Sequence, residues 1–282
     1  MVARLLTRLT VEAGPDGVLA LAAELPYALN GEGPALAPVP AGPAGYVDRV
    51  LATVRPDDPD VPLEDDDVAV VVTTSGSLGE PRGVLLPGAA LIASALATDA
   101  RLGGPARWVM ALPAHHVAGL QVLVRAHLSG IPPVPISSVG GASRFSPVEF
   151  ANATRAARAM CDVDGAPLRT ALVPTQLARI AELGPSAIGC VSAYDTLLIG
   201  GAAAPGGLLA RARALGANIV TTYGMTETCG GCIYEGTALD GVSVGIADPG
   251  NDGYGRIEIS GPTIAHGSVS YTHLTLPTIL LV

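Results

Sequence analysis

Short, continuously apolar runs alternate with longer segments of helical periodicity beyond residue 67. The runs VAVVV, WVMALP, TALVP, DTLLIGG and NIVTTYG predict buried strands at residues 68–72, 108–113, 170–174, 195–201 and 218–224, because strands covered on both faces are apolar throughout. The segments between them predict helices at 88–102, 117–130, 146–160 and 205–215, and a further helix ending at Leu183. Ser146 followed by Pro147 is typical of a helix start.

Strands and helices in this alternation indicate right-handed βαβ units. The predicted fold class is α/β, with mainly parallel sheets flanked by helices. The first sixty residues are rich in Pro and Gly and only weakly periodic, and they yield no predicted element. Residues 56–67, PDDPDVPLEDDD, are expected to form a solvated acidic linker.

Three polar, glycine-rich loops follow predicted strands. They are TTSGSLGEPRG at residues 73–83, GGAAAPGG at 200–207 and TYGMTETCGG at 222–231. Ligands of parallel α/β sheets bind beyond the carboxyl ends of the strands. We therefore expect the three loops to meet at one ligand site.

Composition narrows the class of protein. Apolar residues make up 49% and charged residues 15% of the chain, which indicates a globular protein. A net charge of −9 without any basic cluster argues against nucleic-acid binding, and all 16 basic residues are arginine. Neither a secretion signal nor an apolar stretch long enough to span a membrane is present, so a cytoplasmic location is expected. Cys229 and Cys232 form a C-x-x-C, but zinc would need a second ligand pair nearby, which favours two small loop residues.

The first loop has the chemistry of a phosphate site. Thr73, Thr74, Ser75 and Ser77 offer hydroxyls, Gly76, Gly79 and Gly83 allow close backbone approach, and Arg82 supplies fixed charge. A Walker P-loop is excluded, because counting from Gly76 places Pro81 at the second glycine and Arg82 at the lysine. A surface turn remains the alternative interpretation.

The same loop resembles the T-S-G-[ST]-[TS]-G-x-P-[KR]-G-V signature of the adenylate-forming acyl-CoA synthetase superfamily, with Leu78 as the departure from it. The resemblance implies that this loop holds the ATP phosphates. The residues assigned to this role are Thr74, Ser75, Gly76, Ser77 and Gly79, with Arg82 stabilising charge during catalysis. Leu78 removes one hydroxyl and is expected to weaken the contact with the nucleotide without abolishing it.

YGMTET at residues 223–228 is a second signature of that superfamily. The resemblance implies that Tyr223 stacks on adenine beside Gly224, that Thr226 contacts the α-phosphate and that Glu227 is a Mg²⁺ ligand; Thr226 and Glu227 are the catalytic candidates. The loop at 200–205 would lie beneath adenine, with Gly201 and Ala202 against the base.

Residues 111–128, ALPAHHVAGLQVLVRAHL, together with LVPTQL at 172–177, resemble the o-succinylbenzoate–CoA ligases of menaquinone biosynthesis. The resemblance implies that His116, Gln121 and Arg125 bind a substrate with two carboxylates. A paired-histidine metal site, a structural histidine at a helix start and a solvated arginine on a helix face remain the alternatives. The resemblance covers residues 65–267, and its last part, after YGMTET, implies a small β-rich region.

Beyond Gly267 the resemblance stops. The family continues with a T-G-D motif, a hinge and a C-terminal lid domain that carries a catalytic lysine, whereas this chain reads SVSYTHLTLPTILLV and contains no lysine. We expect residues 1–267 to form an incomplete N-terminal AMP-binding domain, residues 268–282 to be a non-native tail resembling translated adaptor sequence, and the lid domain to be absent.

The expected parent reaction is ATP-dependent activation of o-succinylbenzoate to an acyl-adenylate, followed by transfer to CoA. The expected ligands are a small carboxylic acid, ATP, Mg²⁺ and CoA as co-substrate, with impaired activity in this chain. The alternatives are another acyl-CoA synthetase or adenylation domain, or a non-catalytic nucleotide-binding protein. The sequence leaves a homodimer open.

Overall fold

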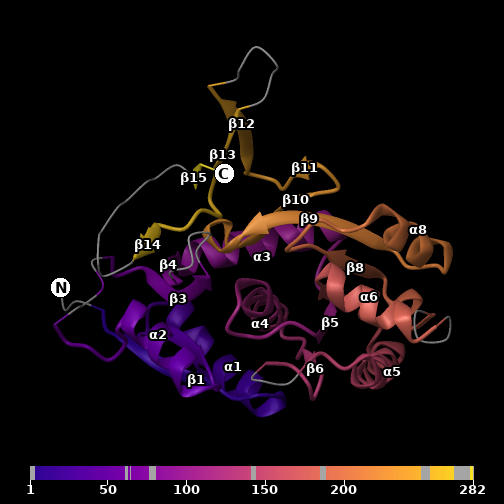
Figure 1. The fold of residues 1–282 in the computed structure, drawn as a ribbon, viewed down its shortest axis with the longest axis horizontal. Helices are drawn as coiled ribbons and strands as arrows, with labels where there is room; N and C mark the ends of the chain where they lie inside the picture. The colour runs from indigo at the N-terminus through magenta and orange to yellow at the C-terminus, as the bar shows by residue number, and fades with distance from the viewer. Residues whose placement is uncertain are drawn as a thin grey trace.

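The computed structural model describes residues 4–60, 63, 65–75, 81–140, 144–184, 189–248, 255–269 and 280–281, which form three β-sheets and the helices around them (Figure 1). The expected α/β class with mainly parallel sheets is confirmed. Among the described residues, no helix has both the length and the apolar character needed to cross a membrane.

The first sheet has the strand order β1-β2-β3-β4-β14. Its strands are β1 (Leu6–Val11), β2 (Ala35–Pro40), β3 (Val68–Ser75), β4 (Pro81–Pro87) and β14 (Gly267–Val269). The pairs β1–β2 and β2–β3 are parallel, whereas β4 is antiparallel to both β3 and β14. The segment TTSGSLGEPRG is therefore a hairpin connection, with Thr74 opposite Arg82, and not a loop leading from a strand into a helix.

The second sheet has the order β11-β10-β9-β8-β7-β5-β6. Its strands are β5 (Arg107–Met110), β6 (Val134–Pro135), β7 (Leu168–Leu172), β8 (Thr196–Ile199), β9 (Ile219–Met225), β10 (Gly230–Tyr234) and β11 (Thr237–Ala238). The strands from β9 to β6 are parallel, and β10 turns back antiparallel to β9.

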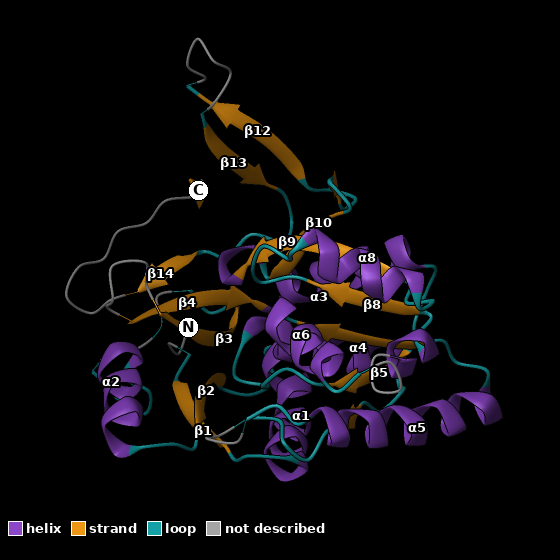
Figure 2. Ribbon diagram, turned by 45° about the vertical axis from the view of Figure 1, so that its right-hand side comes forward, coloured by secondary structure: helices purple, strands orange, loops and turns teal. Residues whose placement is uncertain are grey.

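Helices separate and cover the two sheets (Figures 1 and 2). α1 (Pro15–Leu29), α3 (Gly88–Leu102) and α4 (Val117–Ser129) pack together between the sheets, and α2 (Ala44–Val54) covers the outer face of the first sheet. α5 (Pro147–Asp164), α6 (Pro174–Glu182) and α8 (Gly206–Ala214) lie on the outer side of the second sheet, with short 3₁₀ turns η1 (Gly189–Ala193) and η2 (Thr226–Thr228). Because α4 lies between two sheets, every residue from Gly119 to Ala126 is buried.

A smaller antiparallel sheet near the C-terminus comprises β12 (Ser243–Ala247), β13 (Arg256–Ser260) and β15 (Leu280–Leu281). It projects from the two larger sheets in Figure 1. This is the small β-rich region that the sequence led us to expect.

The sequence predictions differ from the fold mainly in the first sixty residues. This segment forms β1, α1, β2 and α2, although α1 contains Pro26 and β2 reads ALAPVP. β2 is buried at every position because sheet and helices cover both of its faces. Proline interrupts the patterns of α1 and β2, whereas β1, LTRLTV, contains neither proline nor glycine and was still not predicted. By contrast, the predicted helix at 88–102 is α3, and Ser146 caps α5 by accepting a hydrogen bond from the Glu149 N–H at 3.3 Å.

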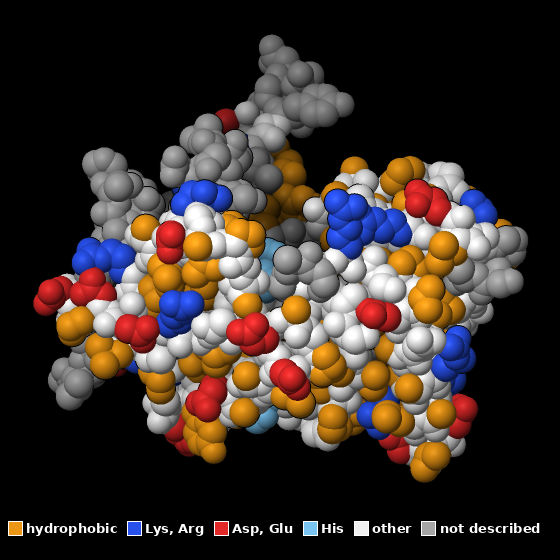
Figure 3. All heavy atoms as spheres, turned by 60° about the horizontal axis from the view of Figure 1, so that its bottom comes forward, with side chains coloured by type: hydrophobic (Ala, Val, Ile, Leu, Met, Phe, Trp, Pro, Cys, Tyr) orange, Lys and Arg blue, Asp and Glu red, His pale blue; other side chains and the backbone are white. Residues whose placement is uncertain are grey.

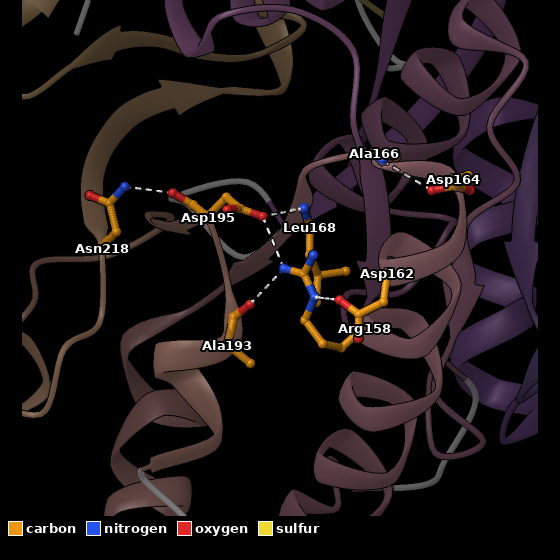
Figure 4. A network of polar contacts seen from close by, with 8 residues as sticks. All are labelled: Arg158, Asp162, Asp164, Ala166, Leu168, Ala193, Asp195 and Asn218. Atoms are coloured by element: carbon orange, nitrogen blue, oxygen red, sulfur yellow. Dashed lines mark hydrogen bonds and ion pairs between the residues drawn. The ribbon is translucent and has the colours of Figure 1, made fainter.

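A polar network joins the amino ends of β7 and β8, on the side opposite to the glycine-rich loops (Figure 4). The Asp195 carboxylate accepts from the Leu168 N–H at 2.7 Å and from Arg158 Nη1 at 3.2 Å. Arg158 also pairs with Asp162 at 3.2 Å, and Asn218 donates to the Asp195 carbonyl. The backbone bond to Leu168 is partly buried, whereas both ion pairs are solvent-exposed.

We expect Asp195→Ala to lower the free energy of unfolding by about 1–2 kcal/mol, because it leaves the Leu168 N–H without its acceptor. Asp195→Asn keeps an acceptor and loses only an exposed ion pair, so its cost should stay below about 1 kcal/mol. Urea unfolding followed by circular dichroism measures both, with the exposed Asp162→Asn as the control. An equal loss in the two Asp195 variants would show that the ion pair, and not the backbone bond, stabilises this end of the sheet.

Candidate active site

A cavity of about 570 Å³ lies where the carboxyl ends of β7, β8 and β9 meet the β3–β4 hairpin and the start of α4. Nine of the residues singled out in the sequence line it: Thr74, Arg82, His116, Gln121, Arg125, Gly201, Gly224, Thr226 and Glu227. The three loops thus meet as expected, although one of them comes from the other sheet. Gly76, Ser77 and Gly79, together with Leu78, lie outside the described residues, and Ser75 is the last residue of β3.

A second cavity of about 500 Å³ adjoins the first and shares Gly201, Thr222 and Gly224 with it. Ala202 and Tyr223 also line this second cavity, so all four residues expected at adenine lie there. The Tyr223 side chain is 37% exposed, which leaves its ring accessible to a planar ligand. The two cavities together offer an apolar compartment beside a more polar one.

Glycine is required at two places where β9 is approached closely, by the end of β8 and by β10. A Cβ on Gly200 would lie 2.2 Å from Thr222 Oγ1, and one on Gly224 would lie 2.0 Å from the Gly230 carbonyl oxygen. Both distances are shorter than any van der Waals contact, so larger residues would push the loop at 200–205 or β10 outward. These glycines keep the walls of the two cavities in place.

Arg125 is the most deeply buried charged residue of the larger cavity, with 4% of its surface exposed. Its Cζ lies 4.8 Å from the centre of the Trp108 ring. Within the described residues the guanidinium has no hydrogen-bond partner, and its Nε is buried and unpaired. Burial lowers the pKa of Arg125, while Tyr234 and Asp99 raise it. Arginine keeps its proton in proteins, so a cation lies in the cavity wall and the solvated helix face is ruled out.

Gln121 lies one helical turn before Arg125. Its Nε2 donates to the Leu91 carbonyl at 3.2 Å, and this bond orients the amide. The Oε1 atom is buried and has no hydrogen-bond partner among the described residues. A buried polar atom without a hydrogen-bond partner costs free energy, and a ligand that supplies the partner removes this cost. Gln121 and Arg125 together therefore form a polar wall suited to binding a ligand.

The two histidines differ in position. His115 is buried with an unpaired Nδ1, whereas His116 is exposed to the cavity, and their ring centroids are 4.3 Å apart. Burial, and to a smaller extent His116, lowers the pKa of His115 to about 3. Partial burial in the cavity also lowers the pKa of His116. Both imidazoles are therefore neutral at pH 7, and His116 can exchange hydrogen bonds with a ligand without adding charge.

The turn that carries Thr226 and Glu227 is held by its own backbone and by a distant segment. Thr228 Oγ1 accepts from the Met225 N–H at 2.9 Å and donates to the Gly230 carbonyl at 2.7 Å. The Ala265 N–H donates to the Glu227 carbonyl at 2.8 Å. This leaves the side chains of Thr226 and Glu227 at the cavity wall, together with Arg82.

Some residues of the site had no signal in the sequence. Tyr234 lines the cavity from β10, and its hydroxyl lies 3.0 Å from Thr98 Oγ1, but β10 was not predicted. The glutamine of LVPTQL, Gln176, is structural, because it accepts from the Val173 N–H at 3.0 Å and donates to the Ala111 carbonyl at 2.9 Å. Cys229 and Cys232 are buried thiols whose pKa values burial raises.

On the face drawn in Figure 3, acidic and basic side chains are interspersed, and histidine atoms lie in a hollow near the middle. Within the described part of the chain, no group of three or more His, Cys, Asp or Glu side chains is arranged to hold a metal ion. Glu227 would therefore have to share a cation with a ligand.

Comparison with known proteins places this geometry in a context. Residues 22–267 match the AMP-binding enzyme family. The chain is 42% identical over 259 residues to a probable 2-succinylbenzoate–CoA ligase of Mycobacterium tuberculosis, covering 92% of this chain and 61% of that protein. The chain thus spans about three fifths of the length of that relative.

Solved structures share the fold. The Bacillus subtilis o-succinylbenzoate CoA synthetase in complex with ATP and magnesium ion superposes with a TM-score of 0.64 at 21% identity, covering 98% of this chain and 66% of that one. The N-terminal subdomain of Klebsiella oxytoca NpsA superposes with a TM-score of 0.70 at 17% identity, covering all of this chain and 83% of that one. With the family match over most of its length, the chain belongs to the AMP-binding enzymes.

Proposed function

We propose that this chain carries the nucleotide and acid sites of an AMP-forming CoA ligase whose acid is o-succinylbenzoate. The observation that carries the proposal is Arg125, a buried cation in the wall of the larger cavity whose Nε has no hydrogen-bond partner among the described residues. The similarity to the M. tuberculosis protein supports the same substrate. The domain with these sites extends to residue 267 in this proposal, as the family match does.

The two cavities suit the two ligands. Adenine would lie in the smaller one, between Tyr223 and the loop of Gly201 and Ala202, where the walls are mainly apolar. The phosphates would extend past Thr226 toward Thr74 and Arg82. The acid would enter the larger cavity with one carboxylate near the phosphates and the other at Arg125, beside His116 and Gln121.

In the proposed first step, a carboxylate oxygen of the acid attacks the α-phosphorus of ATP, and the bond to pyrophosphate breaks. Negative charge grows on the α-phosphate oxygens, where Arg82 and the Thr226 hydroxyl would stabilise it. Glu227 would hold Mg²⁺, which supplies the positive charge needed between a carboxylate and phosphates. In the second step the CoA thiol loses its proton, bonds to the acyl carbon and displaces AMP.

The composition of the chain limits its own turnover in this proposal. No lysine is present among the 282 residues, so the lysine that assists adenylate formation in the family has no counterpart in them. We expect the isolated chain to bind nucleotide weakly and to form adenylate slowly. A ligase for fatty acids is the weaker alternative, because an apolar tail would meet the buried Arg125 cation.

We expect Arg125→Leu to weaken o-succinylbenzoate binding by roughly thirtyfold or more, because it removes the partner of a desolvated carboxylate. Two monocarboxylates that each lack one carboxylate of this acid, 4-oxo-4-phenylbutanoate and 2-butanoylbenzoate, test the assignment. The monocarboxylate that lacks the Arg125-facing carboxylate should bind to Arg125→Leu and to the wild-type chain with nearly the same affinity. Titration calorimetry gives the affinities, and Arg211→Leu, an exposed arginine on α8, is the control. Equal losses for all three acids would contradict a carboxylate at Arg125.

For the nucleotide site, we expect Glu227→Gln to weaken binding of ATP in the presence of Mg²⁺ by roughly tenfold, or about 1.4 kcal/mol. Binding of AMP without metal should change little, since the lost group acts through the cation. Equilibrium dialysis measures both ligands, with Glu182→Gln at the exposed end of α6 as the control. A loss of AMP affinity as large as the loss for ATP would argue that Glu227 shapes the pocket and does not hold the metal.

A further inference from the structure

The Arg125 guanidinium rests on Trp108, which is the only tryptophan of the chain. Trp108 belongs to β5 and is 1% exposed, and Cζ of Arg125 lies 4.8 Å from its ring centre. Trp108 is not among the described residues that line the cavity, whereas Arg125 is. The indole therefore supports the guanidinium from the protein side. A cation above an indole face at this distance is attracted to it, and the attraction is strongest away from water.

The guanidinium needs such support, because hydrogen bonds within the described residues do not hold it. An arginine side chain has several rotatable bonds, and fixing them when a ligand binds costs conformational entropy. Its neighbour Gln121 is oriented by the Leu91 carbonyl. For Arg125, the contact with the Trp108 ring, 4.8 Å from Cζ to the ring centre, can restrain the guanidinium before a ligand arrives.

The charged residues near Arg125 on the protein side do not neutralise its guanidinium fully, so its charge can act on a ligand in the cavity. Asp99 of α3 interacts with Arg125 electrostatically but pairs with Arg169 of β7, at 3.7 Å between Oδ1 and Nη1. Arg169 also donates to the carbonyls of Leu102 and Gly104 at the end of α3. Two buried arginines thus share one buried carboxylate, and the cluster of Asp99, Arg125 and Arg169 keeps a net positive charge.

We propose that Trp108 is a positioning residue that holds the Arg125 guanidinium toward the cavity and thereby sets the preference for an acid with a second carboxylate. This inference rests on the proposed function, because it assumes that a ligand carboxylate meets Arg125. Trp108 itself does not touch the ligand. Its effect should appear in the affinity ratio between the dicarboxylate and the monocarboxylate that lacks the Arg125-facing group, and not in the affinity for that monocarboxylate.

The test compares Trp108→Leu and Trp108→Phe with Phe150→Leu, which removes an equally buried ring that belongs to α5 and packs on Tyr194. Calorimetry with o-succinylbenzoate and the two monocarboxylates gives the affinity ratio for each variant. We expect Trp108→Leu to lower the ratio roughly tenfold. Trp108→Phe keeps an aromatic face and should restore the ratio to within about threefold of wild type. Phe150→Leu should lower the melting temperature but leave the ratio unchanged.

A second measurement uses the unchanged chain and needs no variant to fold. Because Trp108 is the only tryptophan, its fluorescence reports on the guanidinium above it. Titration with o-succinylbenzoate should change the emission, whereas the monocarboxylate that does not engage Arg125 should leave it unaltered.

The outcomes separate this inference from the proposed function. A wild-type chain without preference for the dicarboxylate overturns the proposed substrate, and the role of Trp108 with it. A wild-type preference that persists in Trp108→Leu, or that falls equally in Phe150→Leu, overturns only the role of Trp108. Binding of o-succinylbenzoate without any change in tryptophan emission also overturns it.

Discussion

The burial of Arg125 in α4 is the constraint on which the rest of the site depends. A guanidinium between two sheets loses its hydration, and such a loss is costly unless other groups replace the water. The Trp108 face and the carboxylate of Asp99 replace part of it, and Asp99 is in turn shared with Arg169. The side of the guanidinium that faces the cavity still lacks a group that replaces the lost water. An anionic ligand in the cavity would supply that group. Stability and ligand preference are thus coupled in one group of side chains.

The cavity is a property of two sheets and not of one. Thr74 and Arg82 come from the β3–β4 hairpin of the first sheet, whereas Thr226 and Glu227 follow β9 of the second. α3 and α4 lie between these sheets and set their separation. Substitutions of residues that pack α3 or α4 against the sheets would therefore move the side chains proposed to bind phosphate relative to one another. They would do so without contacting a ligand.

In the proposed function, ligand binding and turnover depend on different groups. The walls for nucleotide and acid are complete enough to form two adjoining cavities. The chemistry of adenylate formation, in contrast, uses a lysine in the family, and these 282 residues contain none.

The sequence by itself indicated the α/β class, several of the strands and helices from residue 68 onward, and nine of the residues that line the larger cavity. These features depend on local periodicity and on short motifs, as the match between the predicted and observed helix at 88–102 illustrates. Periodicity did not reveal β1, α1, β2 and α2. Proline interrupts the patterns of α1 and β2, and β2 is buried at every position. By contrast, β1 contains neither proline nor glycine, and α2 buries only Val50 and Val54. The sequence also did not show that the segment TTSGSLGEPRG connects two antiparallel strands, since β4 was not predicted and its pairing with β3 is a tertiary feature. Only the tertiary structure decided that Arg125 is buried and not solvated, and that Trp108, Asp99 and Arg169 surround it. These residues lie on β5, α3 and β7, and packing between distant segments brings them together.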